Sequence, residues 1–297
     1  MPTGRCVLIF HSYPCLVRYT RRPTPRTIKL VGIFGLLVPV IFVSIFPLLV
    51  MISTSFKTSQ EVYIPPPTFL PRAPTLQNYV DIWQVVPLGT YFWNSLLIGL
   101  GSTFASLVLA IPAAYALARY RFMGKNVYVL FLLGIQMFPP IVLILGLFRL
   151  VAGFNMLDNL LTIIVLNAVF GLSFNTWMLM GFFMTIPQEI EEAAMMDGNS
   201  RVGAMLRMVM PLSWPGITAV SIFSFMNGWN EFTLPLTFLR SQDKLPLTIG
   251  LFKFVTRFKV EWHQLMAASL LATLVVVVLF MIVQEQLTRG MVAFSEK

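Results

Sequence analysis

The chain has 297 residues, of which 57% are hydrophobic and only 11% are charged, and its mean hydropathy is +0.79. A soluble domain is about one quarter charged, so a water-exposed fold cannot bury this much apolar surface and the bilayer must be the solvent. The net charge of +9 does not indicate a nucleic-acid partner, because the basic residues stand at the ends of apolar runs. Composition therefore predicts an integral membrane protein.

The first thirty residues predict a basic cytoplasmic tail that is retained. Six Lys and Arg residues fall within them, and no small-residue cleavage site of a signal peptide separates them. Cys6 and Cys15 also lie there, and two thiols make neither a disulfide framework nor a metal site. A start codon further along the chain is the alternative.

Six apolar stretches are long enough to cross a hydrocarbon core of about 30 Å, which takes roughly twenty helical residues. They run approximately over residues 31–52, 93–118, 127–151, 160–183, 217–238 and 266–282. Thirteen of the 21 Lys and Arg residues lie on the side that both termini share, so the positive-inside rule places that side in the cytoplasm. The connection over residues 239–265 is basic as well, although this topology puts it outside.

Two of these stretches have a distinctive internal pattern. The second carries small residues at every fourth position, a ridge that lets membrane helices pack closely: Ser102, Ser106, Ala110, Ala114 and Ala118. The third contains Pro139 and Pro140, which remove two backbone donors and must kink or break the helix. Freed carbonyls at membrane depth need protein or a water-filled path, which favours a transport pathway over a passive anchor.

The segment over residues 187–211 predicts two short helices outside the membrane. Its first turns carry carboxylates, which oppose the helix dipole: Glu189, Glu191 and Glu192. Asp197-Gly198-Asn199 is a turn signal, Ser200 is a cap for the second helix, and Pro211 follows that helix at the return to the membrane.

An apolar surface on the first of these helices needs an explanation. It consists of Ala193, Ala194, Met195 and Met196, and we expect nothing in this chain to cover it. From these residues alone two interpretations stay open: a loop that merely joins two spans, or a surface that the groove of another protein buries.

The segment resembles the EAA signature of ABC-importer permeases. Glu192, Ala193, Ala194, Gly198 and Pro211 match it at the expected spacing, with Met208 and Met210 in place of an Ile and a Leu. The resemblance covers nearly the whole chain. Within the family, the chain looks like the maltose-type carbohydrate branch and resembles the smaller, six-span member of its pair of permease subunits. Further matching strings lie at residues 75–79, 116–122, 181–183 and 229–232.

This resemblance implies an all-α membrane fold of about six transmembrane helices, with a cytoplasmic coupling helix between the fourth and fifth spans. It divides the chain into a tail over residues 1–30, a permease domain over 31–288 that includes the coupling segment 187–211, and a cytoplasmic tail over 289–297. The protein would be a multi-pass subunit of the cell membrane with both termini cytoplasmic.

The resemblance also implies the partners. Paired ATPase subunits would bind ATP and Mg²⁺, and a second permease subunit would complete a heterodimer that receives a sugar from an extracytoplasmic binding protein. The residues expected to couple to the ATPase are Glu191, Glu192, Ala193, Ala194, Met195, Asp197, Gly198 and Pro211. The resemblance implies that Ala193 and Ala194 form the surface that contacts the ATPase. Glu192 would pair with a basic residue of the ATPase, and Gly198 would permit the turn.

The chain itself is not expected to be an enzyme or to hold a cofactor or metal. Its nearest approach to a phosphate loop is Gly124-Lys125, where Arg119 stands at the position that needs Gly and Asn126 replaces Ser or Thr. The ATPase must therefore be a separate polypeptide.

Polar residues within the fifth span are candidates for the solute path: Asn227, Trp229, Asn230 and Glu231. An ionisable group at membrane depth is a functional candidate, and sugars bind to aromatic faces and amides. The alternative is that these residues hold helices or subunits together.

The solute and the transport class have alternatives too. Similar machinery imports glycerol phosphodiesters or polyols, and the sequence does not name the solute. An ion-coupled secondary transporter would show internal repeats and several buried carboxylates, but only Glu231 fits such a role and no repeat is visible. A structural membrane protein would need neither a docking segment nor a broken span.

Overall fold

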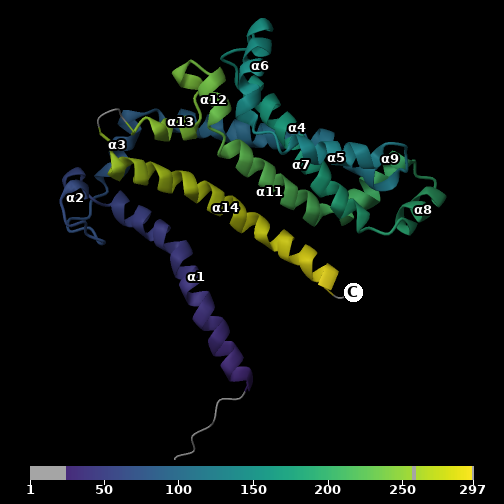
Figure 1. Ribbon diagram of the computed structural model, residues 1–297, viewed down its shortest axis with the longest axis horizontal. Coiled ribbons are helices and arrows are strands. Elements are labelled where there is room, and N and C mark those ends of the chain that lie inside the picture. The colour runs from purple at the N-terminus through teal and green to yellow at the C-terminus, as the bar shows by residue number, and fades with distance from the viewer. Residues whose placement is uncertain (1–24, 256–258, 296–297) are drawn as a thin grey trace, which may run out of the picture. The chain divides into compact units, whose positions relative to one another are not determined.

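The computed structural model describes residues 25–255 and 259–295, and most of these are helical (Figure 1). In that part of the chain the β pairing is limited to an isolated bridge between Val255 and Val260. Residues 1–24, with most of the predicted tail and both cysteines, lie outside the described residues. The chain forms two units, residues 1–49 and 50–297.

The first unit consists, in its described part, of most of helix α1 (Pro25–Ser55), which contains the first predicted span. Every described side chain from Leu37 to Leu49 is exposed. A helix that is apolar all round requires lipid or protein to cover it, as expected of a membrane span. The last turns of α1 belong to the second unit, where the Ser55 and Tyr79 hydroxyls hydrogen-bond at 2.7 Å.

Three further helices contain predicted spans, and their ends differ from the predicted ones by up to five residues except at the end of α14. They are α4 (Leu88–Arg119), α7 (Leu160–Met184) and α14 (Trp262–Ser295). Because α14 continues to Ser295, the predicted tail over 289–297 begins inside a helix. Together with α1, these helices are long and apolar enough to cross a membrane. In α14 the stretch that meets this condition is Trp262–Ile282.

The remaining two spans are broken. Helices α5 (Lys125–Ile135) and α6 (Pro140–Gly153) meet at 93°, so the break predicted at Pro139-Pro140 is confirmed. A second bend of 78° separates Arg201–Leu212 from Trp214–Phe238, and within the latter α11 (Trp214–Trp229) ends well before the predicted end of the fifth span at residue 238. If each bent pair counts as one span, the described residues hold six, which confirms the predicted fold class.

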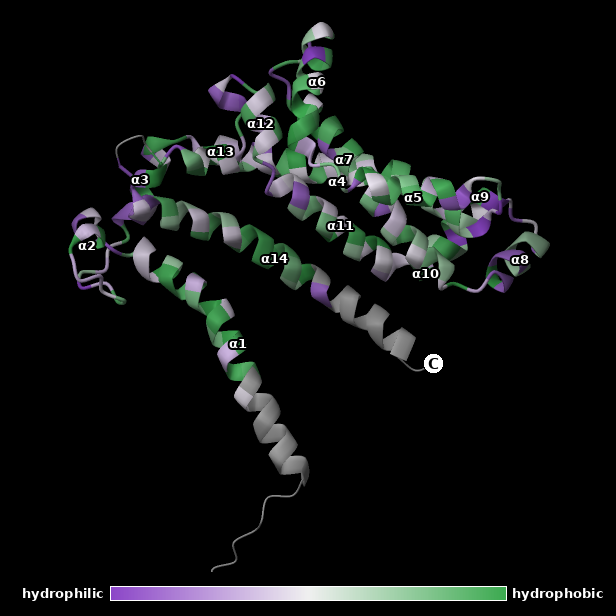
Figure 2. Cartoon of the chain, in the orientation of Figure 1, coloured by the Kyte–Doolittle hydropathy of each residue, from purple (hydrophilic) through white to green (hydrophobic). Residues whose placement is uncertain are grey.

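The core of the second unit is formed by α4, α7 and α11. The small ridge of α4 is buried at Ser102, Ser106, Ala110 and Ala114, as close packing requires. Where α4 meets α11, a Cβ added to Gly228 would lie 3.0 Å from the Cα of Gly99, so the two backbones are in contact. Figure 2 shows the hydrophobic colouring of α4, α7, α11 and α14, which packs against α11.

Short elements gather at the two ends of α4 (Figure 1). Near its start are α2 (Ser59–Tyr63), α3 (Gln77–Val85), α12 (Thr233–Phe238), the 3₁₀ turn η2 (Gln242–Lys244) and α13 (Leu247–Phe252). Near its end are α8 (Glu189–Met196), α9 (Arg201–Ala204), the π turn η1 (Met205–Val209) and α10 (Met210–Leu212). The predicted coupling segment thus lies opposite the loops that were predicted to be external.

The basic connection over residues 239–265 uses its lysines internally. The Lys244 ammonium lies 3.0 Å from the Asp158 carboxylate, and that of Lys253 donates to the Tyr91 hydroxyl at 2.6 Å. Lys259 pairs with Glu261 at 2.9 Å. These contacts give the three lysines partners within the protein.

Candidate functional site

Helix α8 presents two chemically different faces. The exposed face consists of residues at helical spacing: Glu189, Glu192, Ala193 and Met196. The opposite face carries Glu191 and Ala194, both buried. Adjacent glutamates at 191 and 192 therefore point in opposite directions, one into the protein and one to its surroundings.

The inward face is anchored to the end of α4. The Glu191 carboxylate pairs with the Arg119 guanidinium, and the two side chains are only 8% and 6% exposed. The Tyr115 hydroxyl donates to the other carboxylate oxygen at 2.8 Å. A buried ion pair with a further hydrogen bond holds its elements in one arrangement, since separation would leave a charge unpaired in a low dielectric. Helix α8 and α4 are thus linked by a contact between residues 72 positions apart.

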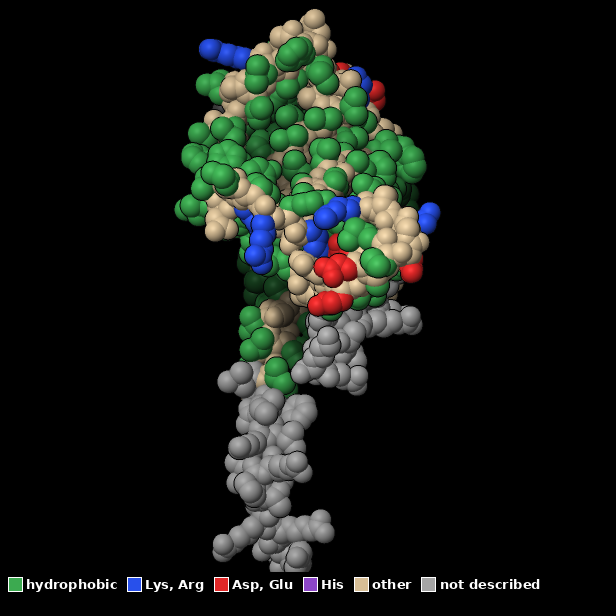
Figure 3. All heavy atoms as spheres, turned by 90° about the vertical axis from the view of Figure 1, so that its right-hand side faces the viewer, with side chains coloured by type: hydrophobic (Ala, Val, Ile, Leu, Met, Phe, Trp, Pro, Cys, Tyr) green, Lys and Arg blue, Asp and Glu red, His purple; other side chains and the backbone are tan. Residues whose placement is uncertain are grey.

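The expectation that nothing in this chain covers the apolar surface of α8 is wrong for Ala194, which is 2% exposed, and in part for Met195. The reason is that the Glu191 pair turns this side of the helix inward. Ala193 and Met196 remain on the surface, Met196 at 89% exposure. Figure 3 views the molecule from the side where α8 lies and shows acidic side chains beside exposed hydrophobic ones.

The turn after α8 has the geometry that its sequence predicts. Gly198 has φ +89°, the left-handed conformation in which a side chain is strained. The N–H groups of Gly198 and Asn199 donate to the carbonyls of Met195 and Ala194, each at 3.1 Å, which is a Schellman C-cap. The Ser200 hydroxyl then accepts from Gly203 N–H at 3.1 Å, so the predicted cap of the second helix is confirmed.

The return to the main bundle differs from the expectation. Pro211 does not follow the second helix but lies within a helical run that continues from Arg201 to Leu212. The π turn makes this possible: Met210 N–H donates to the carbonyl of Met205, five residues back. A wider turn just before a proline accommodates a ring that would clash in a regular helix.

A cavity of about 420 Å³ lies among α4, the α5–α6 break, α7 and α11. Its polar lining consists of Ser102, Gln136, Asn167, Ser224, Asn227 and Glu231, and its aromatic lining of Phe138, Phe170, Phe174 and Phe223. The rings of Phe174 and Phe223 are 4.3 Å apart between centroids. The broken third span therefore borders a partly polar space, as expected for a break at membrane depth.

The structure separates the four residues predicted for a solute path. Asn227 and Glu231 line the cavity. Trp229 is buried on the other side of α11, with its ring stacked on Phe225 and edge-on to Phe92. Asn230 is exposed and does not line the cavity. Asn227 and Trp229 stand on different faces of α11, and Glu231 lies beyond the end of that helix, where the chain turns back to the cavity wall.

Sequence reasoning missed four polar residues of this cavity: Ser102, Gln136, Asn167 and Ser224. The signal available was their position within long apolar runs, where a polar side chain faces the interior of a bundle or a water-filled space. Glu231 has a structural role as well, because its Oε1 accepts from the N–H groups of Thr233 and Leu234 at 2.8 and 3.0 Å, at the start of α12.

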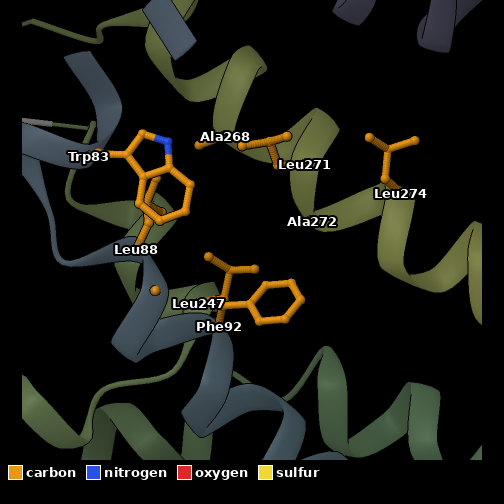
Figure 4. Close-up of a pocket in the computed structure, with 9 residues that line it drawn as sticks. Trp83, Leu88, Phe92, Leu247, Ala268, Leu271, Ala272 and Leu274 are labelled. Atoms are coloured by element: carbon orange, nitrogen blue, oxygen red, sulfur yellow. The ribbon is translucent and has the colours of Figure 1, made fainter. Parts of the chain in front are cut away.

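A second cavity, of about 350 Å³, has a different chemistry (Figure 4). Trp83, Leu88 and Phe92 lie on one side of it and Ala268, Leu271 and Leu274 of α14 on the other. The described residues that line it offer no polar side chain except the Trp83 indole, so it does not suit a hydrophilic solute. The described residues also contain no group of three His, Cys, Asp or Glu that could hold a metal ion.

Comparison with known proteins gives a consistent picture. Residues 106–293 match the family described as binding-protein-dependent transport system inner membrane component. The chain is 34% identical to the inner membrane ABC transporter permease protein YcjP of Escherichia coli K12, over 92% of this chain and 98% of that protein. It is 33% identical to the sulfoquinovosyl glycerol transport system permease protein SmoH of Agrobacterium fabrum, over 84% of this chain and 87% of that protein.

A solved structure has the same fold. It is a bacterial ABC transporter involved in import of the acidic polysaccharide alginate, and one of its chains superposes with a TM-score of 0.76 at 21% identity. The match covers 88% of this chain and 98% of that one.

Proposed function

Because the chain belongs to the family of binding-protein-dependent inner membrane transport components, we propose that it is one of two permease subunits of an ATP-driven sugar importer. Membership confirms the resemblance inferred from the EAA segment, and it makes the chain a multi-pass transport permease of the membrane and not an enzyme. We further propose that the end carrying α8 and both termini face the cytoplasm, as the distribution of Lys and Arg indicates.

The observation that carries the docking proposal is the division of α8 into two faces. An ATPase subunit, which binds ATP and Mg²⁺, receives the exposed face in a groove, with Ala193 and Met196 as apolar contacts and Glu192 paired with a base. The inward face remains fixed to Arg119 of α4. Movement of the ATPase is thereby delivered to α4, whose Ser102 lies on the cavity wall about 25 Å away at 1.5 Å per residue.

The solute proposed is a carbohydrate. SmoH and the alginate importer are named for sugar-containing solutes, and the cavity combines aromatic rings with amide and hydroxyl groups. An extracytoplasmic binding protein would deliver the solute near the loops at the start of α4, and a second permease subunit would close the other half of the path.

Purification of the chain in mild detergent from its native membrane, followed by mass spectrometry, tests the assembly. We expect an ATPase with Walker motifs and a second permease to accompany it. A photo-cross-link to that ATPase from a benzophenone attached to the thiol of Ala193→Cys, made with Cys6 and Cys15 changed to Ser, would place the contact. Ala194→Cys is the matched control, because its side chain faces inward and should not cross-link.

The transport class requires a separate measurement. Uptake that needs ATP and persists when ion gradients are dissipated supports the importer. Solute movement by the chain alone, reconstituted without ATP, would refute the proposal.

A further inference from the structure

The 420 Å³ cavity carries information on the class of solute, beyond its assignment as a path. Its described lining offers three amides, two hydroxyls, four phenylalanine rings and one carboxylate, and none of these lining residues is Lys, Arg or His. Ligand sites of this size commonly combine an apolar wall with a few polar groups that fix orientation. The distribution of charge then determines which solutes are accepted.

Two of the polar groups have no partner. The Ser102 Oγ, on a residue only 2% exposed, has no hydrogen-bond partner in the described structure, and neither does the Asn167 Nδ2. Elsewhere in the same layer the Asn175 Nδ2 donates to Ser106 and Ser224, so pairing is attainable there. A buried polar group without a partner is costly. Both residues line the cavity although these two atoms are themselves buried, so each atom can reach a solute hydroxyl by rotation of its side chain.

The carboxylate of Glu231 gives the lining of the cavity a negative charge. Two backbone N–H groups hold Glu231 Oε1 in place at the start of α12. Among the described residues no protein donor bonds to Oε2, which can therefore accept from a solute hydroxyl. At about 6 Å and an effective dielectric constant near 20, its repulsion of a second negative charge corresponds to roughly 100-fold in affinity. None of the described lining residues supplies a cation to offset this repulsion.

We propose that this cavity selects neutral polyhydroxylated solutes, such as uncharged sugars, against anionic ones, with Glu231 as the discriminating residue. Ser102, Asn167 and Asn227 bind the solute hydroxyls, and the phenylalanines contact the apolar faces of the sugar ring. This inference rests on the proposed function, and it excludes the glycerol phosphodiesters that similar importers carry.

The test reads solute binding directly, without ATP or a binding protein. Ile135→Cys places a thiol on the cavity wall without changing a polar group, in a chain with Cys6 and Cys15 changed to Ser. The rate of alkylation by N-ethylmaleimide is measured in membranes with glucose, maltose or trehalose, and with glucuronate, galacturonate or glycerophosphoglycerol. Met123→Cys, fully exposed in the α4–α5 connection and away from the cavity, controls for effects on the reagent.

We expect at least one neutral sugar to slow alkylation of Ile135→Cys, with a half-effective concentration about 100-fold below that of the anionic compounds. Glu231→Gln should bring the two classes within about threefold. Ser102→Ala should weaken protection by the neutral sugar about three- to tenfold.

Equal or better protection by the anions, or no protection by any neutral sugar, would overturn this inference. None of these outcomes affects recovery of the ATPase with the chain, so failure here is distinct from failure of the proposed function.

Discussion

The ion pair between Arg119 and Glu191 is predicted to be the mechanical link between α8 and the membrane helices. Glu191→Gln keeps the size of the side chain but leaves the Arg119 charge buried and unpaired. Breaking a buried pair costs about 3–5 kcal/mol, because the remaining charge has lost its partner but not its desolvation. Since about 1.4 kcal/mol is a factor of ten, opening of α8 away from α4 should become at least about 100-fold more frequent.

Glu192→Gln is the matched control, because it makes the same chemical change one residue further along the chain on the exposed face. Amide hydrogen exchange of residues 189–199 should accelerate in Glu191→Gln and stay unchanged in Glu192→Gln. In the assembled complex, Glu191→Gln should retain ATP hydrolysis but lower the solute imported per ATP. Glu192→Gln should instead weaken recovery of the ATPase.

The single variants Arg119→Met and Glu191→Met, together with the double variant that carries both changes, form a double-mutant cycle. Well-packed apolar residues often replace a buried ion pair at little cost, so the double variant should recover most of the exchange protection that each single change loses. Unchanged exchange and unchanged import per ATP in both Arg119→Met and Glu191→Met would refute the argument that this pair links α8 to α4.

Three further predictions concern the turn, the helix packing and the loops. Because Gly198 has φ +89°, Gly198→Val should destabilise the turn by about 1–2 kcal/mol. Import by both Gly198→Val and Gly198→Asp should fall while the protein stays in the membrane. Normal uptake by either variant would show that the turn does not need glycine. Gly228→Val should lower the midpoint of thermal unfolding of the purified chain, because its Cβ would lie 3.0 Å from the Cα of Gly99. The expected loss of stability is about 1–3 kcal/mol. An unchanged midpoint would mean that α4 and α11 are not in backbone contact. The Ser241 hydroxyl, then the N–H groups of Ser241 and Arg240, hold the pKa of Asp158 well below its usual range, so its contribution to stability should be complete above about pH 5 and lost progressively as the pH falls further. Thermal unfolding from pH 3 to 7 should therefore show an acid decline that Asp158→Asn reduces, and identical profiles would exclude this role.

The membrane helices were predictable because their signal is local. Apolar length locates a span within a few residues, and a pair of adjacent prolines breaks a helix whatever surrounds it. Gly198 belongs to the same class, since a turn signal beside a predicted helix end already requires the left-handed conformation. Such features depend on neighbours in the sequence, which a single chain displays in full.

The orientation of α8 was not predictable in this way. Glu191 and Glu192 have the same chemistry and the same relation to the helix dipole, and only the position of Arg119 decides which of them is buried. That partner stands 72 residues away. A helix of eight residues has too few apolar side chains to define its own inward face, so long-range charge pairing sets it.

The cavity residues also divide into those that neighbours in the sequence reveal and those that only the fold brings together. Asn227 and Glu231 were found because they cluster in sequence, whereas Ser102, Gln136 and Asn167 come from three separate segments that only the fold brings together. Trp229 was grouped with them by proximity along the chain, although its position on the helix turns it toward Phe92.

Helix α4 contacts each of the three regions that the proposed mechanism involves: the loops near its start, the cavity and α8. Near its start, Asn94 Nδ2 donates to the carbonyls of Asp243 and Leu245 at 2.8 and 3.0 Å, which fixes the loops proposed to meet the binding protein. Its middle carries Ser102 on the cavity wall, and its end carries Arg119. These three contacts span about 38 Å of one helix at 1.5 Å per residue. A tilt of α4 imposed at Arg119 therefore moves the wall and the loops together, whereas a loop held only by flexible connections would not respond.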